Sequence, residues 1–366
     1  MNSCIKITKN DLILGMEVDF LLIGQGLAGT VLSHRLIQDG HSVHLIDDGD
    51  PNSSSKIAAG LYNPVTGRNL VKTWLADILF EEIERFYHEM ERLLDKDLVH
   101  SLGIYRPFVS YEEQNEWVAK SADPQFNAFI KQVFTQSRNK GVKDPFGGVL
   151  LKSTGYINTL ELVNGYSEWL RERNLLTKAV LSEKDLVQTK DGNWQFKEIL
   201  AKKIVFTNGI QARNNTFFNW IPFIPVKGEI LTVKQDYYSS EIINRGVFRI
   251  DMGEGIGKVG STYNNSEVNL CPTDAGKKEI LDKLEQLIEK EVIAIKDHQV
   301  GIRPGIRDRK PVLGKHPSKD NVYLFGGFGA KGVSLVPYLS KQMVKLMVCG
   351  EEPHKEVNIN RFFKYI

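Results

Sequence analysis

Apolar residues near the start of the chain form two short runs on either side of an amphipathic stretch. Residues 18–23 are almost continuously apolar, as in a buried strand. Residues 27–38 have the spacing of a helix, which Gly40 ends, and residues 43–46 form a second apolar run that stops at Asp47. The pattern predicts a strand–helix–strand unit.

Later segments repeat both kinds of pattern. Amphipathic helices are expected over residues 75–98, 160–170 and 277–291, and a last helix ends near Val348. The stretch from 103 to 144 is mixed and polar. Short strands are expected where apolar residues cluster between turn signals, at 179–181, 186–187, 194–196, 204–206, 229–233, 247–250 and 322–325.

Glycines occupy the turn after the first strand at the G-x-G-x-x-G spacing. Gly24 allows a tight turn, Gly26 leaves room for a pyrophosphate, and Gly29 allows the helix to pack close to the strand. The start of the helix, at Leu27 and Ala28, offers free N–H groups and the positive end of its dipole to phosphates. This spacing is typical of a nucleotide-binding turn.

The acidic end of the second strand adds to this signal. Asp47 sits where a carboxylate accepts hydrogen bonds from a ribose hydroxyl, and Asp48 follows it. A glycine-rich turn alone is a weak signal, because a purely structural βαβ unit also uses one. With both strands, the helix and the acid in order, the sequence favours a dinucleotide-binding unit.

Turns of this kind occur at both ends of the chain, and Thr207 and Gly209 mark another at a strand end in the middle. We therefore expect one nucleotide-binding domain built from separated segments, with a second domain inserted between them. The predicted class is α/β (α+β overall). The Rossmann-like domain would comprise residues 18–85, 152–215 and 296–366; a substrate domain with a mixed or antiparallel sheet and helices would comprise 86–151 and 216–295; residues 1–17 would be an N-terminal extension.

The composition is that of an ordinary globular protein. Of 366 residues, 42% are hydrophobic, and 47 basic and 45 acidic residues give a net charge of +2. Near neutrality gives no electrostatic reason to expect nucleic acid or a membrane as a partner. The distant Cys4, Cys271 and Cys349 argue against a disulfide framework or a zinc site, so no metal is expected. Reduced cysteines and the lack of a long apolar segment favour a cytoplasmic location.

Four motifs together resemble one family of flavoenzymes. They are the opening glycine unit, S-S-x-x-A-A-G from Ser54, G-I-R-P-G-I-R-D-R-K-P-V-L-G from Gly301, and G-G-F-G-A-K-G-V-S-L-V-P from Gly326. In this order they resemble the D-amino acid oxidase superfamily, above all glycine oxidase and monomeric sarcosine oxidase. Those enzymes use FAD to act on small amines and amino acids. The resemblance covers about residues 18–350 and implies FAD rather than NAD.

The resemblance also implies which residues contact FAD. The segment from Ser54 runs beside the flavin and pyrophosphate, and the late glycine turn lies at the flavin pyrimidine edge. Reduced flavin carries negative charge there, so N–H groups, a helix start and the cation of Lys331, a candidate catalytic residue, suit it. A glycine-rich connection without a ligand is the alternative. The expected cofactor residues are Gly24, Gly26, Leu27, Ala28, Gly29, Asp47, Asp48, Ser54, Ser55, Ala59, Gly60, Leu61, Thr207, Gly209, Arg303, Gly329, Ala330, Lys331, Gly332 and Val333.

Arg303 is the candidate substrate anchor. In the family, the arginine of an L-R-P-type motif binds the substrate carboxylate, and Ile302-Arg303-Pro304 matches that position. A guanidinium presents a planar fork to a carboxylate, best in a dry pocket. The alternative is a surface arginine in a loop of charges, which suits Arg307 and Arg309 better.

Three positions depart from the family pattern. Phe248 stands where the glycine oxidase branch has a tyrosine that helps to hold the carboxylate, and Ala330 stands where it has an arginine. The cysteine that tethers FAD in sarcosine oxidases has no counterpart near Arg303. These departures imply non-covalent FAD and a pocket that differs from those of both named enzymes.

The resemblance implies hydride transfer from the carbon next to the amine nitrogen to flavin N5, with oxygen or another electron acceptor as oxidant. Two other functions stay open: an NAD(P)-dependent dehydrogenase that uses only the first unit, and a non-catalytic FAD-binding module or flavin partner in tRNA modification. The expected partner is a small amine or amino acid. The sequence leaves the substrate, the acceptor and the oligomeric state open.

Overall fold

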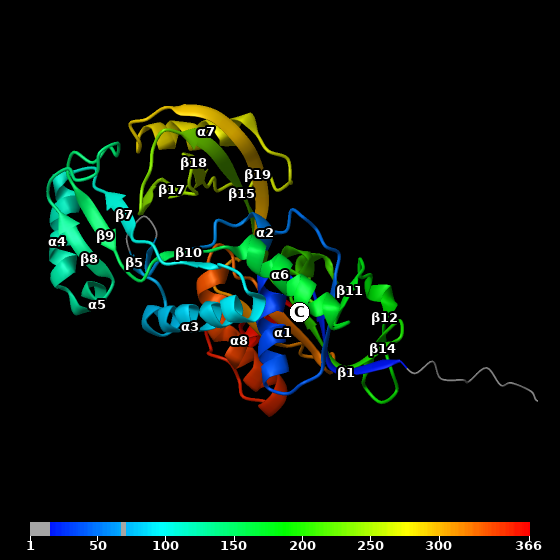
Figure 1. Cartoon of the computed structure of the whole chain (residues 1–366). Coiled ribbons are helices and arrows are strands. Elements are labelled where there is room, and N and C mark those ends of the chain that lie inside the picture. The colour runs from blue at the N-terminus through cyan, green and yellow to red at the C-terminus, as the bar shows by residue number, and fades with distance from the viewer. Residues whose placement is uncertain (1–14, 67–70) are drawn as a thin grey trace, which may run out of the picture.

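A computed structural model describes residues 15–66 and 71–366 (Figure 1). The predicted strand–helix–strand unit is present as β1 (Met16–Ile23), α1 (Leu27–Gln38) and β2 (Val43–Asp47). β1 and β2 pair in parallel, with Ile23 opposite Ile46. Their side chains are buried from Phe20 onward because helices cover the sheet.

The sheet that contains this unit joins segments from the whole chain. Its strand order is β11-β2-β1-β14-β13-β12. In addition, β14 pairs with β21, and β21 pairs with β20. The strands β11, β2, β1, β14 and β21 run parallel, so their carboxyl ends meet at one edge. The new bounds are β11 (Leu176–Lys178), β12 (Leu186–Gln188), β13 (Trp194–Phe196), β14 (Ile199–Phe206), β20 (Val312–Lys315) and β21 (Val322–Gly326).

Four helices pack together beside this sheet. They are α1, α3 (Ala76–Leu94), α6 (Thr159–Glu172) and α8 (Gly332–Cys349), and Figure 1 shows α3 crossing next to α1 and α8. Their buried faces belong to one hydrophobic core, which contains for example Val31, Phe86 and Leu339. Helices from the start, middle and end of the chain therefore stabilise one another.

A second sheet forms the upper part of the molecule in Figure 1. Its order is β19-β15-β18-β17-β16-β7-β9-β8, antiparallel except for the β16–β7 pair. Helix α7 (Asp274–Glu285) packs on β15, β17 and β18, and α4 and α5 lie at the β8 end. The bounds are β7 (Ile104–Pro107), α4 (Tyr111–Ala122), α5 (Pro124–Asn127), β8 (Ile130–Phe134), β9 (Gly148–Leu151), β15 (Phe223–Gln235), β16 (Ile242–Arg245), β17 (Val247–Asp251), β18 (Ile256–Gly260) and β19 (Val292–Ile306).

The long strands β15 and β19 connect the two parts of the molecule. They pair from Phe223 opposite Ile306 to Gln235 opposite Val292. Phe223 and Ile306 belong to a core beside the parallel sheet, whereas Val292 packs against the core beneath α7. One ladder, with register shifts between Thr232 and Val233 and between Lys234 and Gln235, therefore spans both parts.

Short elements complete the chain. The structure places β10 between β3 and β6 in a small sheet, and pairs β4 with β5. Among the described residues, no helix is long and apolar enough to cross a membrane. The remaining bounds are α2 (Ser54–Ile57), β3 (Leu61–Tyr62), β4 (Val65–Thr66), β5 (Val71–Lys72), β6 (Val99–His100), β10 (Gly155–Ile157), and the 3-10 helices η1 (Glu183–Asp185), η2 (Gly209–Asn214) and η3 (Ile359–Tyr365).

The predicted fold class is confirmed, with some corrections to its elements. Residues 179–181 were expected as a strand but follow the end of β11, and the polar stretch 103–144 holds β7, α4, α5 and β8. The domain limits stay a prediction; those after residues 85 and 295 fall inside α3 and β19. The proposed extension 1–17 lies almost entirely outside the described residues.

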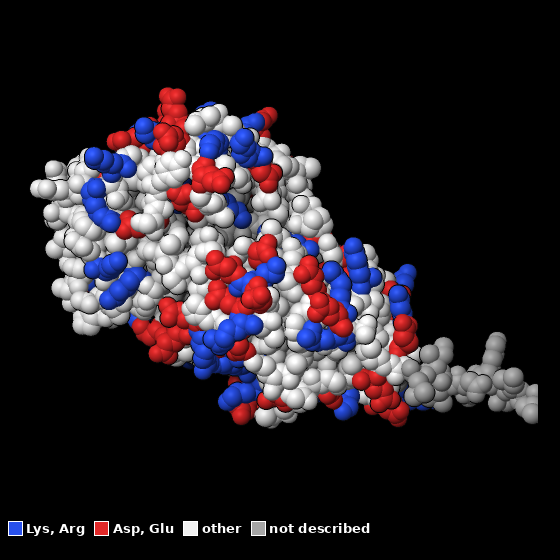
Figure 2. Space-filling model, in the orientation of Figure 1, with Lys and Arg blue, Asp and Glu red and all other residues white. Residues whose placement is uncertain are grey.

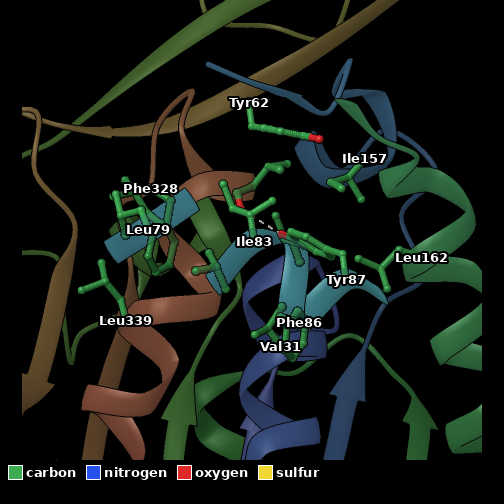
Figure 3. Close-up of a cluster of buried hydrophobic side chains, with 14 of the residues drawn as sticks. Val31, Tyr62, Leu79, Ile83, Phe86, Tyr87, Ile157, Leu162, Phe328 and Leu339 are labelled. Atoms are coloured by element: carbon green, nitrogen blue, oxygen red, sulfur yellow. Dashed lines mark hydrogen bonds between the residues drawn. The ribbon is translucent and has the colours of Figure 1, made fainter. Parts of the chain in front are cut away.

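Tyr87 ties helix α3 to the start of α8, as Figure 3 shows among the buried side chains around it. Pro337 lies inside α8 and has no N–H, so the carbonyl of Val333 lacks its usual helical donor. The hydroxyl of Tyr87 donates to that carbonyl at 3.0 Å. Burial also raises the pKa of Tyr87, so this hydroxyl keeps its proton. A residue of α3 thus replaces the hydrogen bond that Pro337 removes.

We expect Tyr87→Phe to destabilise the protein by about 1–3 kcal/mol, because the buried carbonyl of Val333 would lose its donor. The measurement is urea unfolding of the holoenzyme. Tyr111→Phe is the matched control, since Tyr111 is 64% exposed, and it should change stability by less than about 0.5 kcal/mol. Equal stability of both variants would show that the hydroxyl contributes nothing.

Candidate active site

A cavity of about 930 Å³ lies at the carboxyl edge of the parallel sheet. The glycine turn after β1 and the glycine turn after β21 both line it, through Gly24 and Gly26 on one side and Gly329 and Gly332 on the other. The volume is near the upper end of the range for ligand sites, roughly 300–1,000 Å³. Turns from opposite ends of the chain thus line one cavity, which is large enough for a large ligand.

The first glycine turn is shaped by close backbone contacts. Gly24 has φ of +104°, and a Cβ there would lie 2.6 Å from Cα of Asn208. A Cβ on Gly29 would collide with the carbonyl of Gly24. Gly26 lines the cavity, and a Cβ on it would approach Oγ of Ser55 to 3.0 Å. The turn has no room for side chains, so a ligand can approach its backbone.

Backbone amides at the start of α1 point to an anion. Oγ of Ser55 accepts from the amide of Leu27 at 2.9 Å. The next amides, of Ala28 and Gly29, have no carbonyl four residues back within the helix, and no partner among the residues that the structure describes. Of these two residues Ala28 lines the cavity, so its free amide, together with the helix dipole, suits a phosphate group.

Asp47 fastens this turn to the end of β2. Its carboxylate accepts from the amide of Gln25 at 2.7 Å and from the amide of Gly49 at 2.7 Å. Each carboxylate oxygen has a further acceptor position, and Asp47 and Asp48 both line the cavity. Asp47 therefore orders the glycine turn and can still accept from a ribose hydroxyl.

The turn after β14, at Thr207 and Gly209, is hydrogen-bonded to the first glycine turn. Oγ1 of Thr207 donates towards the carbonyls of Ile23 at 3.0 Å and Gly24 at 2.6 Å, directly below the cavity. Gly209 starts η2 with φ of +57°. Residues 179–184 also line the cavity at this end, although the sequence predicted part of them as a strand.

The late glycine turn is fastened to the Arg303 strand. The amide of Gly329, which has φ of +56°, donates to the carbonyl of Pro304 at 3.0 Å. Helix α8 then begins at Gly332, without an acidic residue in its first turn. Its positive end and free amides therefore face the cavity.

Lys331 and Gly29 are the two expected cofactor residues that do not line the cavity. Nζ of Lys331 lies 3.4 Å from Oγ1 of Thr73, and burial lowers its pKa. Gly29 lies behind the turn, where it allows close packing. The expected residues that do line the cavity are Gly24, Gly26, Leu27, Ala28, Asp47, Asp48, Ser54, Ser55, Ala59, Gly60, Leu61, Thr207, Gly209, Arg303, Gly329, Ala330, Gly332 and Val333.

Arg303 lies on β19 and lines the same cavity. Its guanidinium lies against Gly228 of β15, where any Cβ would collide with it. Nη2 donates to Oγ of Ser261 at 2.6 Å, and Nη1 donates to the carbonyl of Thr262 at 3.2 Å. Burial lowers the pKa of Arg303, which Tyr263 partly offsets, but a guanidinium stays charged.

The charge of Arg303 has no counterion in the described part of the protein. Within the described part of the chain, no carboxylate lies within 4.0 Å of its nitrogens. The nearby walls include Ile230 and Phe248, and Phe248 pairs with Gly260 on the neighbouring strand. A half-buried cation beside apolar side chains, with no carboxylate partner, favours an anionic ligand.

A buried ion network lies on the opposite face of β15 from Gly228. Nζ of Lys227 donates to the carbonyl of Cys271 at 2.6 Å and lies 3.7 Å from Glu229. The carboxylate of Glu229 accepts from the amide and hydroxyl of Thr273 and pairs with Nε2 of His298 at 2.7 Å. The network fastens segment 261–273, which carries Ser261, onto β15.

Lys258 is a half-buried cation that the sequence analysis missed. It lies on β18, and its Nζ donates to the carbonyl of Ala58, which lines the cavity, at 3.3 Å. Burial lowers the pKa of Lys258, partly offset by Asp297. The sequence holds a weak signal for it: a lysine alternates with small and apolar residues in a strand.

The family model described as FAD dependent oxidoreductase matches residues 19–346. The chain belongs to this family. FAD is therefore its cofactor, and the NAD-dependent alternative is not retained. The observed turns fit this oxidoreductase's cofactor, because two glycine cradles and two helix starts face one cavity.

Known proteins similar to this oxidoreductase include two relatives and one solved structure. Glycine oxidase of Pseudomonas aeruginosa is 24% identical over 92% of this chain and 96% of its own length. The tRNA 5-methylaminomethyl-2-thiouridine biosynthesis bifunctional protein of Legionella pneumophila is 21% identical over 93% of this chain, which spans only 54% of that protein. The structure of iminodiacetate oxidase from Chelativorans has a TM-score of 0.74, with 17% identity, and the match covers 94% of this chain and 98% of that one.

We expect Asp47→Ala to weaken FAD binding by roughly tenfold or more, because it removes a charge-assisted acceptor and loosens the amide of Gln25. The measurement is the fluorescence of FAD released on dilution. Asp39→Ala, at the exposed end of α1, is the control and should keep the affinity unchanged. Wild-type affinity in Asp47→Ala would contradict a role in cofactor binding.

Glu229 gives a prediction about stability and pH. Burial acts to raise the pKa of its carboxyl, but hydrogen bonds from Thr273 and His298 outweigh burial, so the pKa is lowered. The charged form therefore stabilises the fold above about pH 4.3, the usual pKa of glutamate, and this stabilisation is lost as the pH falls through the folded value.

Glu229→Gln should therefore be less stable than the wild type at pH 7, by about 1–3 kcal/mol, and the difference should shrink below about pH 4.3. Urea unfolding between pH 7 and pH 3 measures both. Glu285→Gln, at the exposed end of α7, should follow the wild-type curve. A gap for Glu229→Gln that does not change with pH would contradict the assignment.

Proposed function

We propose that this FAD-dependent oxidoreductase oxidises a small amine or amino acid whose carboxylate is held by Arg303. One observation supports this most strongly: a half-buried guanidinium, with no counterion among the residues that the structure describes, lines the cavity that both glycine turns share. A planar fork of donors suits a carboxylate. Glycine oxidase and iminodiacetate oxidase, named among the similar proteins, act on compounds of this kind.

The chemistry that FAD would supply when bound is oxidation, as the acceptor at N5 of a hydride from the carbon next to the amine nitrogen. The protein's own residues bind and orient. The turns at Gly26 and Gly329 would hold the two ends of the cofactor, and Arg303 would fix the substrate carboxylate. The apolar walls at Ile230 and Phe248 would exclude water.

No protein base is required at the amine if the substrate binds with a neutral nitrogen. This explains why the site needs no catalytic pair of histidine and aspartate. The electron acceptor after oxidation of the substrate is oxygen or another molecule, and the residues present suit both.

We also propose that FAD is bound without a covalent link. The described residues that line the cavity include neither cysteine nor histidine. Cys271 and Cys349 are exposed elsewhere. In the same part of the chain, no group of three acidic, histidine or cysteine side chains is arranged to hold a metal ion.

A second candidate is a flavin enzyme in tRNA modification. The similarity to about half of the Legionella pneumophila bifunctional protein favours it. Figure 2 argues for a small substrate instead, because basic and acidic side chains are interspersed over this face and the net charge is only +2. Anaerobic addition of total tRNA separates the two, since bleaching of the flavin by tRNA alone would support the second candidate.

The test of the main proposal is anaerobic mixing of the holoenzyme with a panel of amines and amino acids. At least one carboxylate-bearing amine should bleach the flavin absorbance. Bleaching by none of the panel would contradict the proposed oxidation.

Arg303→Leu should retain FAD but lower kcat/KM for that substrate by roughly 100-fold, because a buried charge-assisted pair is lost. Arg307→Leu is the matched control, since Arg307 follows the same strand but is exposed, and its kinetics should be those of the wild type. Unchanged kinetics in Arg303→Leu would exclude this arginine as the anchor.

A further inference from the structure

Ser261 holds a hydroxyl at the point where Arg303 meets the cavity. It follows β18 directly and lines the cavity. Its Oγ lies 2.6 Å from Nη2 of Arg303 and accepts that hydrogen bond. A hydroxyl that accepts in this way still has its own hydrogen to donate.

The guanidinium of Arg303 is only partly satisfied. Nη1 faces two backbone carbonyls, of Thr262 at 3.2 Å and of Lys227 at 3.5 Å. Nη2 gives one hydrogen to Ser261, which leaves a second hydrogen on Nη2 and the hydrogen on Nε. Neither has a partner within residues 15–66 and 71–366. Arg303 and Ser261 are thus bonded to each other, both line the cavity, and both keep a donor for a ligand.

Phe248, on the adjacent strand, cannot supply a hydrogen bond there. It lines the same wall and pairs with Gly260, directly before Ser261. Its ring contributes apolar surface only. A carboxylate oxygen that is turned away from Arg303 would thus find its donor at Ser261 and not at Phe248.

The backbone around Ser261 is fixed on both sides. Oγ1 of Thr262 accepts from the amide of Glu229 at 2.9 Å, and the amide of Asn264 donates to the carbonyl of Lys227 at 3.0 Å. The buried pair of Lys227 and Glu229 anchors these contacts. The hydroxyl of Ser261 is therefore held in place before a ligand arrives, which lowers the entropic cost of binding.

We infer that Ser261 determines specificity for a carboxylate, donating its hydroxyl hydrogen to the substrate carboxylate that Arg303 binds. This rests on the proposed function and adds a residue to it. The substrate class is an amine that carries a planar monocarboxylate next to the carbon that is oxidised. A decarboxylated amine in its place would leave Arg303 and Ser261 without an acceptor, and an amide would offer one neutral oxygen in place of two charged ones.

Binding of acetate to the oxidised holoenzyme tests this inference without turnover. Acetate carries the carboxylate and has no amine to oxidise, and calorimetry or the shift of the flavin spectrum reports its affinity. Ser261→Ala should bind acetate about tenfold or more weakly. Ser261→Thr, which keeps the hydroxyl, should bind it close to the wild type. Acetamide should bind weakly to all three proteins.

Ser266→Ala is the matched control, because Ser266 is an exposed serine of the same segment that does not line the cavity. Its affinity for acetate and its melting temperature should be those of the wild type. The FAD content and melting temperature of Ser261→Ala should also match the wild type, which separates lost recognition from lost folding.

Two results would overturn the inference. In the first, Ser261→Ala binds acetate as tightly as the wild type, while Arg303→Leu loses the affinity for acetate. This result would leave the proposed function intact and would exclude Ser261 from carboxylate binding. The other is equal weakening in Ser261→Ala and Ser261→Thr, which makes the hydroxyl irrelevant. If Arg303→Leu also binds acetate normally, the carboxylate site itself lies elsewhere, and the proposed function fails at its anchor.

Discussion

The parallel pairing of β14 with β1 on one side and β21 on the other is the constraint on which the site depends. Strands that run in parallel present their carboxyl ends at one edge, so turns far apart in sequence become neighbours. Thr207, at the end of β14, then bonds the carbonyls of the first glycine turn. Without this central strand, the two glycine turns would have no common cavity.

The part of the cavity around Arg303 depends on both faces of β15. On one face, Lys227 and Glu229 are buried and fasten segment 261–273. On the other, Gly228 has no side chain and lets Arg303 lie flat at the cavity. Successive residues of a strand face opposite sides of the sheet. Lys227 and Glu229 therefore hold segment 261–273 on one side, while Gly228 between them leaves room for the guanidinium of Arg303 on the other. The polar network fixes the position of the segment that carries Ser261, and the lack of a side chain at Gly228 lets Arg303 reach the cavity.

The sequence predicted the parts of this site that depend on local spacing. The turn from Gly24 to Gly29 and the acid at Asp47 lie within one short unit, and their pattern carries its own physical reason. Arg303 needed the family resemblance, because nothing near it in sequence marks a cavity. Ser261 and Gly228 were missed, since they reach Arg303 only through pairing of β15, β18 and β19. Lys331 was expected as a cofactor contact from its neighbours in sequence; its ammonium lies by Thr73, and the contact stays a prediction.

The ladder between β15 and β19 has a consequence for how substrates enter. Domains that open and close by a hinge motion need hinge residues, usually a few loop residues that absorb large changes in φ and ψ. Here the paired strands β15 and β19 run from one hydrophobic core to the other, and bending them between Phe223 and Thr232, where the register is regular, would break paired backbone groups. Substrate entry to the cavity therefore depends on movement of individual segments of its wall. Mutations that change turnover through product release should lie in those segments and not in β15 or β19.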